Sequence, residues 1–173
     1  MSAAALDHDQ EAIYTAVRAF VLAVLGNIEV VQGLGNRVPS PTGGFCAITA
    51  VGAGRLATNT HIYDDNTGTA SAAQHQTYNV QIDCYGEASS NWAAVLSTLL
   101  RDEYATAQFP AWLQPLYSVD PRQAPLITAE AQYEQRWIVE AVLQYNATVT
   151  TGQDFFDTIE VGIIEVDEAY PPT

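Results

Sequence analysis

Two histidines and two aspartates stand at the ends of one short polar segment, and these residue types bind metal ions or transfer protons. His61, Asp64 and Asp65 lie at its start, and His75 lies at its end. If the segment is a hairpin, its two ends come close together and these side chains could share a metal ion. Their spacing matches no known ligand pattern, and histidines in loops are usually solvated. We therefore predict no metal site and no cofactor.

Other catalytic and nucleotide-binding patterns are incomplete. Gly33 and Gly35 begin a dinucleotide fingerprint, but Val38 replaces its third glycine. Pro39 then prevents the helix whose first turn would hold the pyrophosphate. The sequence contains no lysine for a phosphate-binding P-loop and no GxSxG nucleophile elbow. We expect a protein that is not an enzyme and has no catalytic residue.

All six basic residues are arginines, scattered singly along the chain: Arg18, Arg37, Arg55, Arg101, Arg122 and Arg136. A guanidinium group pairs with a carboxylate either within one chain or across a subunit boundary. A surface pair within one chain contributes at most about 1 kcal/mol, and this is the more common arrangement for any single arginine. The candidate contacts with other subunits or partners are Arg37, Arg101, Arg122, Arg136, Asp64, Asp65 and His75.

Three of these arginines have informative neighbours in the sequence. Arg37 and Arg122 lie in loops bounded by prolines, and we predict that both reach another subunit. Arg136 lies between Glu134 and Glu140 on the polar face of a predicted strand, near enough for contacts on the same face.

The charge balance limits the partners. Twenty acidic residues against six basic ones give a net charge of −14. Binding to phosphates needs clustered cations, so we expect no specific nucleic-acid recognition. The same charge repels an anionic membrane surface. It suits a wall along which DNA slides without adhering, although acidity more often serves solubility alone.

Cysteine usage and the N-terminus indicate the compartment. Cys46 and Cys84 are too few and too far apart in sequence for a disulfide framework or a CxxC metal site, so we expect two small buried hydrophobes. The N-terminus has no basic region of a secretory signal, and its longest apolar run, Ala19–Leu25, is too short to span a membrane. We expect a protein that is made and kept in a reducing cytoplasm.

Two helices are predicted. The first runs from Asp7, its capping residue, to Leu25, with Gly26 as the left-handed stop. The second runs from about Ser90 to Glu103, with Ser89 or Ser90 as the cap, and its apolar positions recur at helical spacing. The apolar stripe of the first helix consists of Ile13, Val17, Phe20 and Val24 with Ala16 and Val21. Each helix must pack its apolar face on a sheet or on another helix.

Five or six strands, mostly antiparallel, complete the prediction. The segment Asp64–His75 is small and polar, which predicts an exposed loop at the tip of a hairpin. The pattern favours an α+β fold with two main helices on one face of the sheet. We expect one domain over residues 1–173, with frayed tails at 1–6 and 168–173. The clearest predicted strands are Phe45–Val51, Arg55–Tyr63, Gln76–Tyr85, Gln132–Thr150 and Phe156–Val166.

Several short phrases of the sequence resemble those of the phage neck-terminator, or tail-terminator, family. They occur in the expected order between Ile28 and Asp167. They are Gly35-Asn36-Arg37-Val38-Pro39, Gln81-Ile82-Asp83-Cys84-Tyr85-Gly86, Leu100-Arg101-Asp102-Glu103-Tyr104, Asp120-Pro121-Arg122-Gln123, Tyr133-Glu134-Gln135-Arg136-Trp137 and Leu143-Gln144-Tyr145-Asn146.

This resemblance implies a structural virion protein that forms a ring, commonly of six subunits, on the completed tail tube and joins it to the head-side connector. Its expected partners are copies of itself, the tail tube protein, connector or neck proteins, and the sheath as a further candidate. DNA would pass through the lumen. The implied location is the virion, after assembly in the cytoplasm of the bacterial host. No catalytic residue is implied, and the Asp64–His75 segment has no counterpart among the matching phrases.

Two alternatives remain open from the sequence. One is another ring-forming tail component, such as a tube or baseplate subunit. The other is a small-molecule-binding α+β domain in which Tyr133, Trp137 and Tyr145 line a pocket, although aromatic residues at strand spacing more often form core. Sheet edges and an extended hairpin could supply the subunit contacts of a ring.

Overall fold

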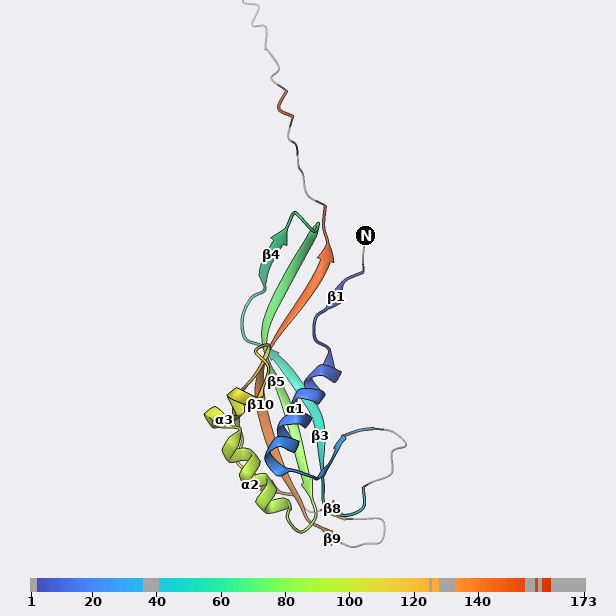
Figure 1. Ribbon diagram of the computed structural model, residues 1–173, viewed down its shortest axis with the longest axis vertical. Helices are drawn as coiled ribbons and strands as arrows, with labels where there is room; N and C mark the ends of the chain where they lie inside the picture. The colour runs from blue at the N-terminus through green and yellow to red at the C-terminus, as the bar shows by residue number, and fades with distance from the viewer. Residues whose placement is uncertain are drawn as a thin grey trace, which may run out of the picture.

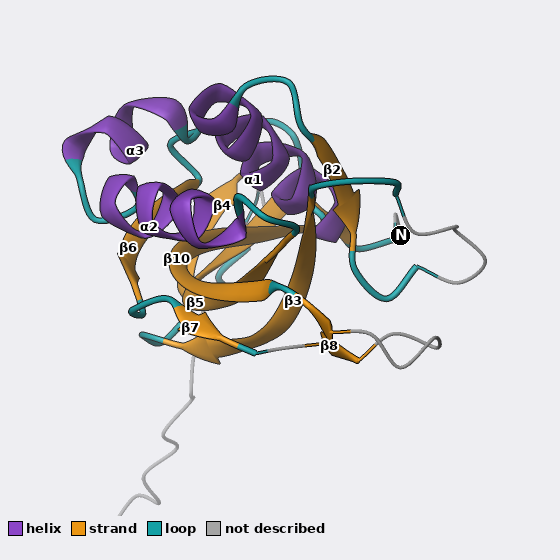
Figure 2. Cartoon of the chain, turned by 90° about the horizontal axis from the view of Figure 1, so that it is seen from below, coloured by secondary structure: helices purple, strands orange, loops and turns teal. Residues whose placement is uncertain are grey.

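The fold is α+β, as predicted, with an eight-stranded mixed sheet, a separate two-stranded sheet and three helices in the part of the chain described (Figure 1). The computed structural model describes residues 3–35, 41–124, 126–127, 133–154, 158 and 160–162. All three helices lie on one side of the large sheet (Figure 2).

Two long strands form the centre of the sheet. β5 (Thr69–Tyr85) and β10 (Arg136–Gly152) pair antiparallel along their full lengths. β3 pairs antiparallel with one half of β5, and β4 pairs antiparallel with the other half. β2 lies on the far side of β3 and is parallel to it. The far edge of β10 pairs with three short antiparallel strands, β1, β6 and β7. The bounds of these strands are Ala5–Leu6 (β1), Glu29–Gln32 (β2), Phe45–Arg55 (β3), Thr60–Asp64 (β4), Leu113–Ser118 (β6) and Arg122–Gln123 (β7), and the two-stranded sheet is β8 (Leu126–Ile127) with β9 (Tyr133–Glu134).

The first helix begins three residues later than predicted. α1 (Gln10–Leu25) is capped by Asp9, whose side chain accepts a hydrogen bond from the Ala12 amide at 3.0 Å. Asp7 was the wrong choice of cap because its carboxylate accepts from the Thr148 amide, at 3.0 Å, and so fastens the N-terminal segment to β10. Gly26 ends the helix at φ 77°, as predicted.

The second predicted helix ends earlier than expected, and a short third helix that the sequence did not predict follows it. α2 (Ser89–Leu99) ends at Leu99, with Leu100 as its C-terminal cap. α3 (Glu103–Gln108) begins after Asp102, whose carboxylate accepts from the Tyr104 amide at 2.9 Å. This new cap restarts the chain in another direction. The predicted serine cap of α2 is absent, since Ala88 occupies the cap position and makes no side-chain bond there.

The core lies between the helices and the facing side of the sheet. From α1 it takes Ile13, Val17, Phe20 and Val21, which confirms the predicted apolar stripe, and the Phe20 ring meets that of Phe109 at 5.2 Å. Burial of such side chains stabilises the fold by about 1.5–3 kcal/mol each. Cys46 and Cys84 are free, fully buried members of this core.

The predicted loop Asp64–His75 is mostly strand. Only the residues between Asp64 and Thr69 turn the chain, and β5 continues from Thr69 through His75 in register with β10. The outer ends of β5 and β10 therefore project beyond the helices, with β4 at one edge and β1 at the other (Figure 1). We call this projecting part the arm. It consists of β1, β4, residues 69–76 of β5 and residues 145–152 of β10.

Some predicted features fall outside the described residues. The predicted strand Phe156–Val166 is described only at Thr158 and at 160–162, which carry no strand, and the tail 168–173 is not described. At the other end, Ala5 and Leu6 pair with Thr150 and Val149, although the sequence placed them in a loose tail.

In the described part of the chain, none of the helices combines the length and the apolar character needed to cross a membrane.

Candidate assembly surfaces

The residues proposed as a conceivable metal site are spread along the arm. His61 lies opposite Ala72 and Asp64 opposite Thr69, whereas His75 lies six residues farther along β5 from Thr69. At about 3.3 Å per residue, the hairpin places Asp64 and His75 roughly 20 Å apart. Among the described residues, no three His, Cys, Asp or Glu side chains gather where they could hold a metal ion.

Asp64 shapes the turn at the tip of the arm. Its carboxylate accepts from the Asn66 amide at 3.0 Å and from the Asn66 side chain at 3.3 Å. A hydrogen bond from Thr67 is the main cause that lowers the pKa of Asp64 below its usual value. Asp65 accepts from the Asn66 side chain, at 3.3 Å. These contacts are those of a self-stabilised turn.

His75 binds across the sheet. It lies directly opposite Asn146 on β10, and its Nδ1 is 2.7 Å from the Asn146 Oδ1. The same Asn146 oxygen also accepts from the Gln144 side chain at 3.1 Å. This cross-strand pair stiffens the base of the arm.

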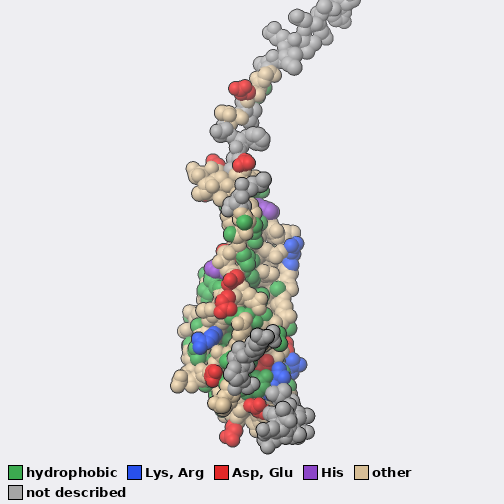
Figure 3. Space-filling model, turned by 90° about the vertical axis from the view of Figure 1, so that its right-hand side faces the viewer, with side chains coloured by type: hydrophobic (Ala, Val, Ile, Leu, Met, Phe, Trp, Pro, Cys, Tyr) green, Lys and Arg blue, Asp and Glu red, His purple; other side chains and the backbone are tan. Residues whose placement is uncertain are grey.

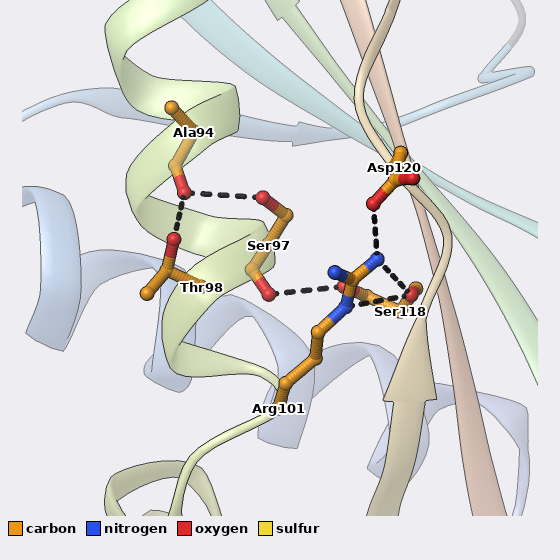
Figure 4. A network of polar contacts seen from close by, with 6 residues as sticks. All are labelled: Ala94, Ser97, Thr98, Arg101, Ser118 and Asp120. Atoms are coloured by element: carbon orange, nitrogen blue, oxygen red, sulfur yellow. Dashed lines mark hydrogen bonds and ion pairs between the residues drawn. The ribbon is translucent and has the colours of Figure 1, made fainter.

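Arg101 joins the end of α2 to the open edge of the sheet (Figure 4). It lies just after α2, and its Nε and Nη2 donate to the Ser118 carbonyl at 2.9 and 2.7 Å. Nη2 also pairs with Asp120 at 2.7 Å, where the Asp120 side chain is 87% exposed. Ser118 in turn donates its hydroxyl to the Ser97 carbonyl at 3.1 Å, which satisfies one of the last carbonyls of α2.

Arg122 lies in β7, opposite Ile138 of β10, where the sequence predicted a loop, and it has a partner within its own chain. Its Nη2 lies 2.5 Å from Glu140 Oε1, and both side chains are exposed. An exposed pair of this kind contributes at most about 1 kcal/mol and can exchange one carboxylate for another. Arg122 therefore stays available for the intersubunit role predicted from sequence. Arg37 lies outside the described residues.

Arg136, on β10, forms an ion pair with Asp83 on the neighbouring strand β5. Its Nε and Nη2 donate to Asp83 Oδ1 at 3.1 and 2.9 Å, across from β10 to β5. The Asp83 side chain is 5% exposed, and both its oxygens accept from Gln81 Nε2 at 3.0 and 2.9 Å. The ion pair of Arg136 is thus with Asp83 on the neighbouring strand, and Glu140, expected as a contact on the same face, pairs with Arg122 instead.

The arm carries few charges. No Asp, Glu, Lys or Arg occurs in Thr69–Ile82 of β5, in Ala141–Gln153 or in Thr60–Tyr63 of β4. Figure 3 shows one face, on which the arm is mostly uncharged while acidic and basic side chains gather on the body below it. The whole protein has a net charge of −14, but the arm is nearly uncharged. Another protein can therefore cover the arm without removing many charged groups from water, which would cost free energy.

The aromatic residues considered for a pocket serve the core where they are described. Tyr145 is buried, and its hydroxyl donates to the His8 carbonyl. Its ring meets those of Tyr78 and Trp112 edge to face, at 6.1 and 6.0 Å. Trp137 packs against the same core. The Tyr133 side chain is outside the described part.

Comparison with known proteins agrees with this fold. Residues 11–168 match the family described as phage neck terminator protein. Eleven chains of solved structures match. One is the sheath/tube terminator, in the extended state, of an extracellular contractile injection system, PVC; it shares 13% identity over 96% of this chain, with a TM-score of 0.50. That likeness shows a shared fold, and this chain spans 66% of that longer chain.

No curated protein matches. The family match nevertheless extends over nearly every element described above, from α1 through β10. The chain belongs to the phage neck terminator family.

Proposed function

We propose that this protein is a structural component of the virion neck that terminates the tail as a ring and catalyses no reaction. The observation that carries the proposal is the family match over residues 11–168. The fold shared with a sheath/tube terminator supports it. The expected partners are the last ring of the tail tube, the sheath where one exists, and the connector on the head side.

A closed ring needs two different complementary surfaces on each subunit. The long sheet with its projecting arm offers surfaces of different chemistry, since the arm is largely uncharged and the body carries the ion pairs. We propose six subunits, and a lumen through which DNA passes. The net charge of −14 would keep DNA from adhering to such a lumen.

Arg37 and Arg122 remain our candidates for contacts between subunits. The Arg122–Glu140 pair is exposed. Arg122 can therefore exchange Glu140 for a carboxylate of a neighbouring subunit at little cost in free energy. Arg37→Ala and Arg122→Ala should each reduce assembly, as measured by light scattering after size exclusion. Unchanged assembly in both variants would remove these residues from the interface.

Mixing the purified protein with tail tubes tests the function itself. Electron microscopy should show added density at one end of each tube, and tubes with this density should no longer elongate when more tube protein is supplied. Binding along the sides of tubes, or no binding at all, would contradict a terminator. A bovine serum albumin control sets the background of the images.

A further inference from the structure

The arm is a four-stranded sheet whose strands lie level with one another. Ile62 of β4 pairs with Ser71, Ser71 pairs with Thr150, and Thr150 pairs with Ala5 of β1. The next row contains His61, Ala72, Val149 and Leu6. The register therefore sets the two outer strands level in the ladder, and they lie on opposite edges of the arm.

The two edges run in opposite directions. Each neighbouring pair in the order β4, β5, β10, β1 is antiparallel, and the number of strands is even. If the β4 edge of one copy meets the β1 edge of the next, the contact is again antiparallel. The alternation then continues without interruption from subunit to subunit, and the ladder hydrogen bonds can form.

The charges of the two edges allow this contact. Thr60–Tyr63 and Ala3–Leu6 carry no charged residue. When the rows are level, Asp64 of one copy faces the height of Ala3 in the next, and Asp7 faces Thr60, so no two acids oppose each other. Apolar side chains stand exposed at both edges, with Ile62 63% and Leu6 50% exposed.

β6, an edge strand of the body, is protected against the addition of another strand, whereas the edges of the arm are not. Edge strand β6 contains Pro115, which has no amide proton to donate, and its Ser118 carbonyl is occupied by Arg101. β4, in contrast, contains no proline. An unprotected, exposed strand edge is a site for the addition of another strand.

We infer that the arms of successive copies join edge to edge, β4 against the neighbour's β1, and close into one continuous antiparallel sheet around the ring. The occupant of each open edge is thus a second copy of this chain. This inference rests on the proposed ring and adds the contact that closes it.

Disulfide crosslinking tests the contact. Within one chain, residues 62 and 5 are three strand spacings apart, about 14 Å, which exceeds the roughly 7 Å that a disulfide can bridge. A disulfide in the double variant Ile62→Cys/Ala5→Cys must therefore join two copies. Ile62→Cys/Ala3→Cys tests a register shifted by two residues. The buried native Cys46 and Cys84 stay protected from the oxidant.

Oxidation with copper phenanthroline is carried out on the protein alone and on protein bound to tail tubes. We expect at least one double variant to give a ladder of two, three and more linked chains on a denaturing gel, and either single variant to give none. A covalent dimer of Ile62→Cys alone would show that two β4 edges meet, which contradicts the inference. Rings of the expected mass without a ladder would overturn it and leave the proposed function intact.

A charge placed on the edge supplies a second test. Ile62→Lys should lower the fraction of assembled protein by about tenfold, because a lysine blocks strand addition. Leu116→Lys on β6, also exposed, should change it by less than about twofold. Equal effects of the two substitutions would contradict the inference. If no ring forms in any sample, with or without tubes, both the contact and the proposed function fail.

Discussion

Cys46 on β3 and Cys84 on β5 lie directly opposite each other, with their sulfur atoms 3.5 Å apart and both side chains fully buried. The hydrogen bond between the two thiols, followed by burial, raises the pKa of Cys84 above its usual value. The thiolate is the reactive form, so we expect Cys84 to be unreactive in the folded protein, and burial shields the Cys46 sulfur from reagents.

We predict that iodoacetamide at pH 8 modifies the folded protein at least about tenfold more slowly than the protein in denaturant. The matched control is Val51→Cys on β3, whose new thiol lies at an exposed position outside the proposed subunit contact and should react at the rate of a free cysteine. Rapid modification of Cys46 or Cys84 in folded protein, located by peptide mapping, would show that this part of the core opens readily.

Stability should fall at alkaline pH. Burial is the main cause that raises the pKa of Tyr78, Tyr85 and Tyr145. The pKa of Cys84 is raised as well. A raised pKa in the folded state means that, above the pKa of the unfolded group, the folded protein holds more protons. Unfolding then becomes easier as pH rises, starting near pH 8.5 for the cysteine.

Urea titrations between pH 7 and pH 10 measure this effect. The unfolding free energy should decline by up to about 1.4 kcal/mol per pH unit for Cys84. Cys84→Ala should have a shallower slope, even if it is less stable at pH 7. A slope that is the same in both proteins would assign the alkaline loss to the tyrosines alone.

The ion pair of Arg136 and Asp83 should matter more than the other two. The Asp83 side chain is 5% exposed and that of Arg136 25%, so removal of one partner leaves a charge without compensation in a poorly solvated place. We predict that Arg136→Ala lowers the unfolding free energy by about 3 kcal/mol. Asp120→Ala, which breaks the exposed pair with Arg101, should lower it by less than about 1 kcal/mol. Losses of equal size in urea titrations would refute this ranking.

Gly86 should tolerate no side chain. It has φ 100°, and a methyl group there would lie 3.0 Å from the Gly44 Cα. We predict that Gly86→Ala lowers the unfolding free energy by about 1–3 kcal/mol. Gly52, in β3, has open space around the same position, so Gly52→Ala should cost nothing and can stabilise slightly. Thermal unfolding followed by circular dichroism compares the two variants, and a harmless Gly86→Ala would contradict the strain argument.

The sequence predicts well where periodicity is strong. The spacing of Ile13, Val17 and Phe20 identified the buried face of α1, and the alternation along Gln76–Tyr85 identified the inner half of β5. It failed where the side chains are small and uniform. Ala70, Ser71 and the following alanines show no contrast between two faces, so only pairing with β10 makes them a strand.

The sequence also did not predict the contacts between residues that are far apart in the chain. Asp7 and Asp9 are equally suited to cap a helix, and the choice depends on Thr148, which lies at the far end of the chain. The partner of Arg136 likewise follows from the register of β10 against β5, which local patterns do not contain. Asp83 is the one charged residue in the sequence of β5, and this was the available signal for a buried ion pair.

The mass of the assembled particle tests the central claim most directly. Native mass spectrometry of the purified chain, alone and released from tail tubes, should give one dominant species at six times the 18.7 kDa chain mass. It should be closed, with no series of larger oligomers. A protein that stays monomeric at all concentrations and also on tubes, or an open series of growing oligomers, would contradict a ring that terminates the tail.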